Sequence, residues 1–395
     1  MGKRLALLAC TGVCIAAMAS AAGNGQGPKP ADLKVRGGVH SFATLPERGV
    51  PGAPLGHPEG LCADAAGNIY ANTFDFGSQN YIYVFDRQGK LISSTPTPGA
   101  RNDSDYPVAP LGCTVSGNKL YVNDVVHGNE LVYTLPLSDN DRPYSTLSVC
   151  GGPFGGAPDT DHPQCFLNAN YVNPIDKQVY ISDNGGALFG DVIGRIWVLN
   201  PETGLASRFI DNPPELKVAD GPYVGMTPPV PSATVLPFSA NGVAFSRDGS
   251  ALYIANMSTN KIYKQPVANC NLPSGCERNG GLTLFSSDPI IQGPDNMDFD
   301  DRGNLWIASG QNNHVVVLNS KGDVAAVFGN FEGFEKDGAP KGLLQPSGII
   351  FANGTIYVGN ESNPSLMTLK AGIDFSPLRL FTISRISAEI PDNGK

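Results

Sequence analysis

The stretch SANGVAFSRDGSALYIA, residues 239–255, has a form that recurs along the chain. A polar residue and a glycine come early, a short apolar strand follows, a turn interrupts the chain, and a second strand has the pattern Leu/Ile-Tyr/Trp-Val/Ile. Five further stretches have related forms: HPEGLCADAAGNIYA (57–71), APLGCTVSGNKLYVN (109–123), FLNANYVNPIDKQVYIS (166–182), GPDNMDFDDRGNLWIAS (293–309) and QPSGIIFANGTIYVG (345–359). The repeats begin near residues 57, 109, 166, 238, 293 and 345, which is 52 to 72 residues apart and typical of propeller blades with loop insertions.

One such repeat cannot bury both faces of its sheet, whereas repeats packed around an axis can. Six repeats therefore predict an all-β protein, a six-bladed β-propeller of four-stranded blades around a central tunnel, over residues 57–386. Residues 33–48 (LKVRGGVHSFATLPER) contain strand-like pieces that would supply the outer strand of the last blade. Residues 22–56 are thus predicted to be an N-terminal segment with a closing strand, and residues 387–395 a C-terminal tail.

The first 21 residues have the features of a secretory signal peptide. Lys3 and Arg4 are followed by an apolar run over residues 5–18 and by the small residues 19–21. A lipoprotein signal ending at Cys10 is the weaker alternative, because little hydrophobic chain precedes this cysteine. The sequence therefore predicts a secreted or periplasmic protein, and the apolar run is too short to favour a membrane span.

The formal net charge is −9, and loss of Lys3 and Arg4 with the signal would make it −11. An acidic chain without a basic stripe is a poor partner for nucleic acid, because it must overcome phosphate repulsion. The 47 glycines and 33 prolines suit many short strands joined by turns. We expect a small-molecule substrate, and the sequence makes no prediction of the oligomeric state.

Eight cysteines are present, and Cys10 and Cys14 fall within the signal, which leaves six. An even number in an oxidising compartment indicates disulfides, and none of the spacings is a convincing zinc signature. Two pairs that bracket short loops are predicted to be bonded: Cys150 with Cys165, and Cys270 with Cys276. A third bond, between Cys62 and Cys113 on the leading strands of neighbouring repeats, is left open.

Equivalent positions of a closed ring converge on its axis, and here one position leads each repeat. These leading residues are Glu59, Leu111, Asn168, Asn241, Asp295 and Ser347. Four of them carry a carboxylate or amide oxygen, which together would form a cation site. The alternative is that each is only a turn former, as Asn and Asp often are. Glu59 argues against this alternative, because glutamate is a poor turn residue.

The predicted metal ligands are Glu59, Asn168, Asn241 and Asp295, and Ca²⁺ is the expected ion because it takes six to eight oxygen ligands in irregular geometry. The lack of His or Cys argues against zinc and copper. Mg²⁺ and Mn²⁺ are alternatives, and Zn²⁺ is the least well matched. A partly open ion could polarise a carbonyl group or activate water.

These repeats resemble the senescence-marker-protein/gluconolactonase/paraoxonase group of six-bladed propellers, the calcium-dependent phosphotriesterase superfamily. The closest stretches are residues 239–263 and 294–308. The resemblance implies a calcium-like ion in the tunnel, held by a Glu of the first blade, Asn residues of later blades and an Asp heading another. The four predicted ligands match these places one by one. Asn296 could make a second contact, as in paraoxonase-like members.

The resemblance also bears on catalysis. Paraoxonase-like enzymes have a histidine near the metal that is proposed to act as a base, and His127 lies at a similar place. The alternative for His127 is a surface turn residue before Gly128. In gluconolactonase-like members the metal-binding aspartate is the suspected base, which points to Asp295. Asp295 and His127 are therefore the predicted catalytic residues.

We therefore expect an exported metal-dependent hydrolase of lactones or related esters, in which activated water attacks a metal-polarised carbonyl. Long loops at residues 96–109, 151–165 and 211–237 would overhang the axis. Aromatic residues in or near them would shape the substrate pocket: Phe154, Phe189, Tyr223 and Phe238. Two alternatives are a non-catalytic binding propeller with NHL-like repeats and a metal-free synthase or lyase of the strictosidine-synthase-like type.

Overall fold

The structure is a computed structural model that describes residues 36–50, 53–99, 107–151, 165–186, 191–221, 235–271, 275–278, 280–364 and 373–390. The predicted signal peptide lies outside these ranges, as do Phe154, Phe189 and Tyr223. Within the described residues, no helix is both long enough and apolar enough to cross a membrane.

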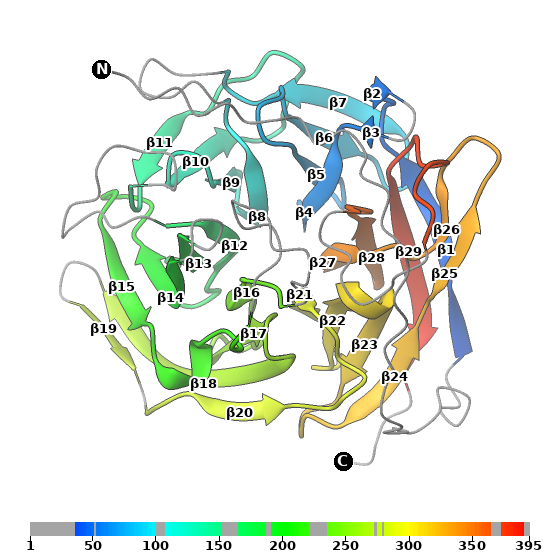
Figure 1. The fold of residues 1–395 in the computed structure, drawn as a ribbon. Helices are drawn as coiled ribbons and strands as arrows, with labels where there is room; N and C mark the ends of the chain where they lie inside the picture. The colour runs from blue at the N-terminus through cyan, green and yellow to red at the C-terminus, as the bar shows by residue number, and fades with distance from the viewer. Residues whose placement is uncertain are drawn as a thin grey trace.

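Six antiparallel sheets surround a common axis, which confirms the predicted six-bladed β-propeller (Figure 1). The first three blades are, from the inner strand outward, β4 (His57–Ala63), β5 (Ile69–Phe74), β6 (Tyr81–Phe85) and β7 (Leu91–Pro96); β8 (Pro110–Ser116), β9 (Lys119–Asp124), β10 (Asn129–Thr134) and β11 (Ser145–Ser148); and β12 (Leu167–Val172), β13 (Val179–Gly186), β14 (Asp191–Leu199) and β15 (Ala206–Asp211).

The last three blades are β16 (Ala240–Phe245), β17 (Ala251–Asn256), β18 (Lys261–Asn271) and β20 (Thr283–Ser286); β21 (Pro294–Phe299), β22 (Leu305–Ser309), β23 (His314–Leu318) and β24 (Val324–Phe328); and β27 (Pro346–Ala352), β28 (Thr355–Asn360), β29 (Thr382–Glu389) and β1 (Arg36–Thr44). In the fourth blade β19 (Gly275–Arg278) also pairs with β18. Two hairpins, β2 (Gly49–Val50) with β3 (Ala53–Pro54) and β25 (Phe331–Phe334) with β26 (Pro340–Gly342), and the 3₁₀ turns η3 (Pro214–Leu216) and η4 (Gly310–Asn312) complete the described elements.

The ring is closed by strands from both ends of the chain. β1 pairs with β29 from Arg36 opposite Glu389 to Thr44 opposite Thr382, with one irregularity between Ser41 and Ala43. In Figure 1 the blue strand β1 accordingly lies beside the red strand β29. Hydrogen bonds between the two chain ends therefore hold the sixth blade together, and this pairing leaves β29 without a free edge.

Carboxylates at the first turn of two blades explain part of the repeated sequence. Asp64 accepts hydrogen bonds from the backbone and side chain of Asn68 and from the Tyr70 hydroxyl. Asp300 does the same for Asn304 and for the indole nitrogen of Trp306. One aspartate thus fixes both the turn and the aromatic residue of the second strand.

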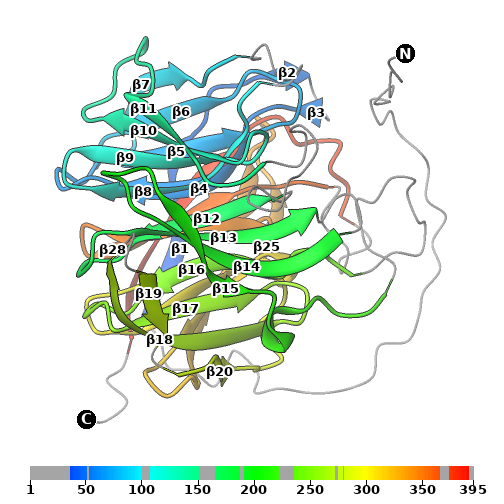
Figure 2. The ribbon, with the colours of Figure 1, turned by 90° about the vertical axis from the view of Figure 1, so that its left-hand side faces the viewer.

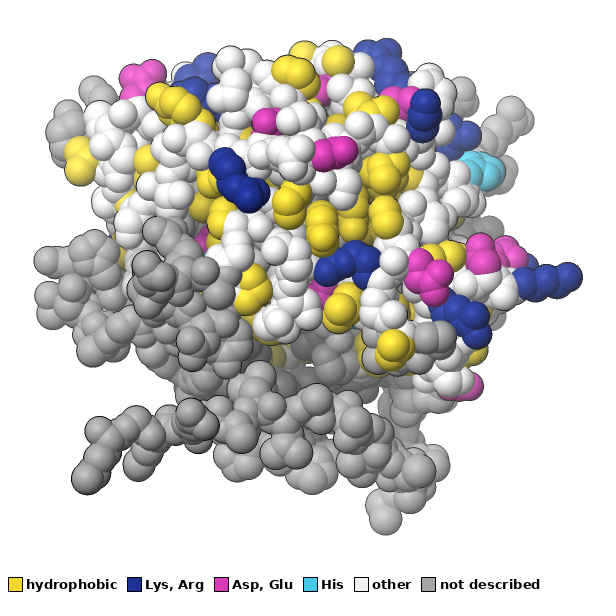
Figure 3. All heavy atoms as spheres, turned by 90° about the horizontal axis from the view of Figure 1, so that it is seen from above, with side chains coloured by type: hydrophobic (Ala, Val, Ile, Leu, Met, Phe, Trp, Pro, Cys, Tyr) yellow, Lys and Arg dark blue, Asp and Glu magenta, His cyan; other side chains and the backbone are white. Residues whose placement is uncertain are grey.

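Apolar side chains fill the space between neighbouring blades. Figure 2 shows the ring of blades from the side. Between the third and fourth blades, for example, the rings of Tyr180 and Phe245 are 4.8 Å apart and buried. The outer surface is mixed. On the side shown in Figure 3, basic and acidic side chains are interspersed with apolar ones, and this face carries no basic stripe among the described residues.

Two disulfides occur among the described residues. Cys150 is bonded to Cys165, which confirms that predicted pair. Cys62 is bonded to Cys113, so the bond left open by the sequence joins the inner strands of the first two blades. Cys270 lies opposite Cys276 in the β18–β19 ladder, and a disulfide there stays a prediction. Disulfides fit a protein of an oxidising compartment.

A carboxyl group is buried between the second and third blades. Glu130 on β10 is 0 % exposed, and the Asn170 side chain donates a 2.5 Å hydrogen bond to its Oε1. Burial raises the pKa of Glu130 well above its ordinary value, and the bond from Asn170 opposes this rise. Because the pKa is higher in the folded state, the stabilisation from this group is complete at low pH and is lost as the pH rises.

We expect Glu130→Gln to be more stable than wild type at pH 8, by about 1 to 3 kcal/mol, because glutamine cannot acquire a buried charge. At pH 4 the two proteins should have similar free energies of unfolding, since wild-type Glu130 is then protonated. Urea unfolding at both pH values measures this. A difference between the proteins that is the same at pH 4 and pH 8 would contradict the assignment.

Candidate metal centre

The six leading residues lie at the same structural position, a bulge in the inner strand of each blade. In the first blade the pairing jumps from Pro58 to Leu61, which skips Glu59 and Gly60. The pairing of the other five inner strands is interrupted at the equivalent two residues. A bulge changes the direction of a side chain. The repeated sequence therefore specifies the same interruption of strand pairing in every blade.

The residue after the leading one is glycine in four blades, and close contact between blades requires this. A Cβ atom on Gly60 would lie 2.0 Å from the carbonyl oxygen of Leu111, and one on Gly242 would lie 2.1 Å from that of Asp295. Gly112 and Gly348 approach the backbone of Asn168 and Glu59 in the same way. Each of these blades thus touches the leading residue of the next. We call the six leading residues the hub.

Side chains of the second strands brace the hub. Asn72 on β5 donates a 3.1 Å hydrogen bond to the carbonyl oxygen of Leu111, and Asn123 on β9 donates a 2.8 Å bond to that of Asn168. The Ser182 hydroxyl on β13 donates to the carbonyl oxygen of Asn241. All three donors are fully buried. The backbone of three leading residues is therefore held by the preceding blade.

Three carboxylates converge at the hub. Glu59, Asp295 and Glu361 each place an oxygen so that these atoms lie within 4.8 Å of one another. The three residues are 5 %, 4 % and 3 % exposed. The structure thus brings together two of the four predicted ligands. It adds Glu361, which the sequence did not predict because this residue follows β28 and stands outside the leading position.

The two predicted amide ligands occupy equivalent bulges of β12 and β16. Asn168 Oδ1, Asn241 Oδ1 and Glu59 Oε2 are buried and have no hydrogen-bond partner among the described residues. A buried acceptor without a donor is costly, and a cation would satisfy such oxygens. Carboxylate and amide oxygens without His or Cys fit a hard ion such as Ca²⁺.

The pKa shifts of the three carboxyl groups also indicate a cation site. Burial raises the pKa of Glu59 to about 7, and the Ser347 hydroxyl opposes this rise. Burial also raises the pKa of Asp295 and of Glu361 well above the ordinary values, and the charge of Glu59 adds to both shifts. Among the described residues, no Lys or Arg forms an ion pair with these carboxylates. A bound cation would remove their mutual repulsion.

His127 lies in a turn and is half-buried, with a side chain that is 7 % exposed. It follows β9, and its Nδ1 lies 2.6 Å from Oδ2 of the buried Asp124. Its Nε2 is buried and has no hydrogen-bond partner among the described residues. His127 does not belong to the group of carboxylates at the hub.

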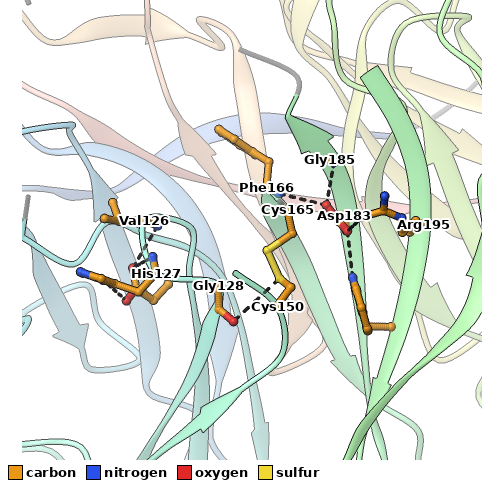
Figure 4. The surroundings of a disulfide bond; sticks show 11 residues. Val126, His127, Gly128, Cys150, Cys165, Phe166, Asp183, Gly185 and Arg195 are labelled. Atoms are coloured by element: carbon orange, nitrogen blue, oxygen red, sulfur yellow. Dashed lines mark hydrogen bonds and ion pairs between the residues drawn. A yellow bond between two sulfur atoms is a disulfide. The ribbon is translucent and has the colours of Figure 1, made fainter. Parts of the chain in front are cut away.

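The disulfide Cys150–Cys165 supports the turn that carries His127 (Figure 4). The sulfur of Cys150 lies 3.8 Å from the carbonyl oxygen of Gly128, and the backbone N–H of Cys150 donates to the same oxygen. Cys165 lies just before β12, which carries Asn168. The bond therefore links the His127 turn to the start of a hub strand.

An apolar cluster adjoins the hub on the side of the first four blades. Its buried members are Ala109, Leu111, Val125, Val126, Phe166, Leu236, Phe238 and Met257, with Phe74 and Phe76 packed against them. Phe238, one of the predicted pocket residues, is thus placed in this cluster. Leu111 belongs to both groups, and the Met257 sulfur lies 3.2 Å from Nδ2 of Asn241.

Asn296, the predicted second contact, is half-buried, and its Nδ2 lies 3.4 Å from Oδ1 of Asp295. It also lines a cavity of about 340 Å³ to which all six inner strands contribute. Asn170, Arg247 and Asp298 line the same cavity. Asn296 therefore both contacts the carboxylate of Asp295 and lines this cavity.

Replacing Gly242 by alanine should disturb the hub, because the new Cβ would clash with the backbone of Asp295. We expect Gly242→Ala to lower the free energy of unfolding by about 1 to 3 kcal/mol, the usual range for overpacking, as measured by urea unfolding. Gly281→Ala is the matched control, since a Cβ there meets nothing within 4 Å. Equal stability of the two variants would argue against a tight contact between the blades.

Comparison with known proteins connects this geometry to a family. Residues 238–328 match the family model described as "SMP-30/Gluconolactonase/LRE-like region". The match spans β16 to β24 and includes Asn241 and Asp295. It confirms the resemblance identified in the sequence. No curated protein sequence matches the chain.

Solved structures with the same fold include a luciferin-regenerating enzyme, with 13 % identity and a TM-score of 0.55 over 87 % of this chain and 95 % of that one. A calcium-binding protein, regucalcin, from Agrobacterium tumefaciens has 15 % identity and a TM-score of 0.52 over 87 % and 94 %. A gluconolactonase from Xanthomonas campestris has 14 % identity and a TM-score of 0.50 over 85 % and 87 %. At these identities the likeness shows the fold alone.

Proposed function

We propose that this protein is a metal-dependent hydrolase of lactones or related esters. The observation that carries the proposal is the hub, where the buried carboxylates of Glu59 and Asp295 converge and the amide oxygens of Asn168 and Asn241 have no partner among the described residues. The match of residues 238–328 to a gluconolactonase-containing family adds support. Fold alone would not suffice, because one fold hosts many functions.

Glu59, Asn168, Asn241 and Asp295 would hold a divalent cation, with Ca²⁺ as the best match to their oxygens. Such an ion, when bound, supplies Lewis-acid stabilisation of the negative charge that develops on the carbonyl oxygen. The contacts between blades hold the backbone of these four residues in place before substrate arrives. The apolar cluster beside Asn241 would contact the non-reacting part of the substrate.

Two residues are candidates for the base that takes a proton from water. Asp295 is already at the hub. For His127, the carboxylate of Asp124 accepts the hydrogen bond from Nδ1, which leaves Nε2 as the basic nitrogen. A histidine oriented by a buried aspartate is a common arrangement for general bases. The disulfides Cys62–Cys113 and Cys150–Cys165 support our proposal that the protein is exported.

Asp295→Ala should lose both metal binding and hydrolysis, because it removes a carboxylate from the hub. We expect kcat/KM on a panel of lactones and aryl esters to fall by about 1000-fold or more, with metal content measured on the same samples. Asp298→Asn is the matched control on the same strand. The Asp298 carboxylate is buried too, but it accepts bonds from Tyr171 and from the backbone of Phe351.

Chelator and metal assays of the wild-type protein distinguish the hydrolase from a binding propeller and from a metal-free enzyme. Loss of activity with chelator and its return with Ca²⁺, Mg²⁺, Mn²⁺ or Zn²⁺ would identify the ion. Metal binding with no turnover of any substrate would favour a binding propeller. Activity that survives complete metal removal would favour a metal-free synthase or lyase. Full activity of Asp295→Ala would rule out the proposed site.

Replacing His127 decides between the two bases. If His127 is the base, His127→Ala should lower kcat by about 100-fold or more while metal affinity stays unchanged, and Asp124→Asn should lower kcat in the same direction. His314→Ala, which changes a histidine on β23 of the fifth blade, is the control and should retain activity. Wild-type kcat in His127→Ala would assign the proton transfer to Asp295.

A further inference from the structure

The sixth blade contributes Ser347 to the hub, and this leading residue has no carboxylate. The same blade supplies Glu361 immediately after β28, with an oxygen within 4.8 Å of those of Glu59 and Asp295. We propose that Glu361 is a direct ligand of the cation, so that the hub binds its ion through three carboxylates rather than two. The inference rests on the proposed function only for the presence of a cation.

A cluster of carboxylates is not by itself a metal site, and a second observation supports this one. Asn168 Oδ1 and Asn241 Oδ1 are buried at 5 % and 2 % residue exposure, occupy the equivalent bulges, and accept no hydrogen bond from the described residues. Glu59 Oε2 is in the same condition. Buried amide and carboxylate oxygens of three leading residues therefore lack a partner among the described residues, and a bound cation would supply one.

Hydrogen bonds to the backbone fix the turn that contains Glu361. The N–H of Glu361 donates a 3.0 Å bond to the carbonyl oxygen of Gln345, and the N–H of Ser362 donates to that of Leu344. The N–H of Asn363 donates a 2.6 Å bond to the Gln345 side-chain oxygen. Residues 361–363 are therefore tied to the segment that leads into β27.

Two residues that make these contacts adopt the left-handed conformation without being glycine. Gln345 has a φ of 49° and Ser362 a φ of 52°. Non-glycine residues in this region are unfavourable and persist where surrounding contacts enforce them. Here the Asn313 side chain accepts a 2.9 Å bond from the N–H of Gln345. The fold thus maintains an unfavourable backbone at the turn that presents Glu361.

Both the side chain and the backbone carbonyl group of Glu361 accept hydrogen bonds. The Asn363 side chain donates a 3.2 Å bond to Glu361 Oε1, and Nδ1 of His57 donates a 2.7 Å bond to the Glu361 carbonyl oxygen. The His57 ring packs on Phe381 with centroids 4.5 Å apart. Outer contacts of this kind orient a metal-binding carboxylate and tune its affinity. His57 and Asn363 are therefore positioning residues for Glu361.

A third carboxylate changes which ions the hub prefers. Three buried negative charges attract a trivalent ion more strongly than a divalent one of similar size, because Coulomb energy scales with the product of the charges. Removing one charge should reduce trivalent affinity by a larger factor than divalent affinity. Direct coordination also excludes a water molecule from the ion. These two effects distinguish a ligand from a carboxylate that only lies nearby.

Terbium luminescence tests both effects on the full-length protein. Lifetimes in H₂O and D₂O give the number of waters on bound Tb³⁺, and competition gives the Kd for Ca²⁺. We expect Glu361→Ala to add about one water to the ion and to raise the Tb³⁺ Kd by about tenfold or more. Glu361→Gln should raise the Kd for Tb³⁺ by a larger factor than the Kd for Ca²⁺.

Glu130→Gln is the matched control, because Glu130 is also buried and bonded to an asparagine but is outside the group at the hub. It should leave hydration and both Kd values unchanged. If Glu361→Ala does not fold, the near-isosteric Glu361→Gln carries the test through its affinities. Unchanged Kd values, or unchanged hydration in a folded Glu361→Ala, would overturn the assignment.

The outcome is independent of catalysis. Wild-type protein that binds Tb³⁺ with the expected loss in Glu361→Ala, yet hydrolyses no lactone or ester, would sustain Glu361 as a ligand and reject the hydrolase. If wild-type protein hydrolyses its substrate only with metal, and both Glu361 variants bind ions as wild type does, the hydrolase would be sustained and Glu361 would be rejected as a ligand. Failure of wild-type protein to bind any cation would reject both.

Discussion

The close approach of backbone to backbone at the hub is the constraint on which the rest of the structure depends. Gly60, Gly112, Gly242 and Gly348 have no side chain where the leading residue of the next blade passes. Larger residues there would push the inner strands apart. Because the inner strands touch, their bulged residues are brought from distant parts of the sequence to one axis. The apolar packing between blades stabilises the ring, but the hub sets its inner dimension.

The same constraint buries charge that the fold itself does not neutralise. Glu59, Asp295 and Glu361 are removed from water with no basic partner among the described residues, which ordinary cores avoid. Asp183, by contrast, is fully buried but bonded to Arg195 and to the indole of Trp197. The chain therefore pairs a buried carboxylate with a cation at Asp183, but leaves the three carboxylates at the hub, and Glu130, without one among the described residues. Polar groups that break this rule are typical of functional sites.

The repeated phrase was sufficient to predict the blades, because strand, bulge, turn and strand are all local in sequence. It also indicated Glu59 and Asp295, which share one position in that phrase. Glu361 could not be found this way, since its place depends on left-handed Gln345 and Ser362, and neither residue type signals that conformation. His127 was noticed in the sequence, but its contact with Asp124 depends on the shape of a turn that the pattern does not specify.

The hub is not sixfold symmetric, because two of its leading residues carry neither a carboxylate nor an amide. At the second blade the leading residue is Leu111, which joins the apolar cluster with Phe166 and Phe238. At the sixth it is Ser347, beside which Glu361 enters from another segment. The apolar cluster thus adjoins the hub at the second blade, and the three carboxylates approach it from the first, fifth and sixth blades. A neutral substrate whose carbonyl points at the carboxylate side would place its hydrocarbon part against the cluster, so the asymmetry itself would orient it.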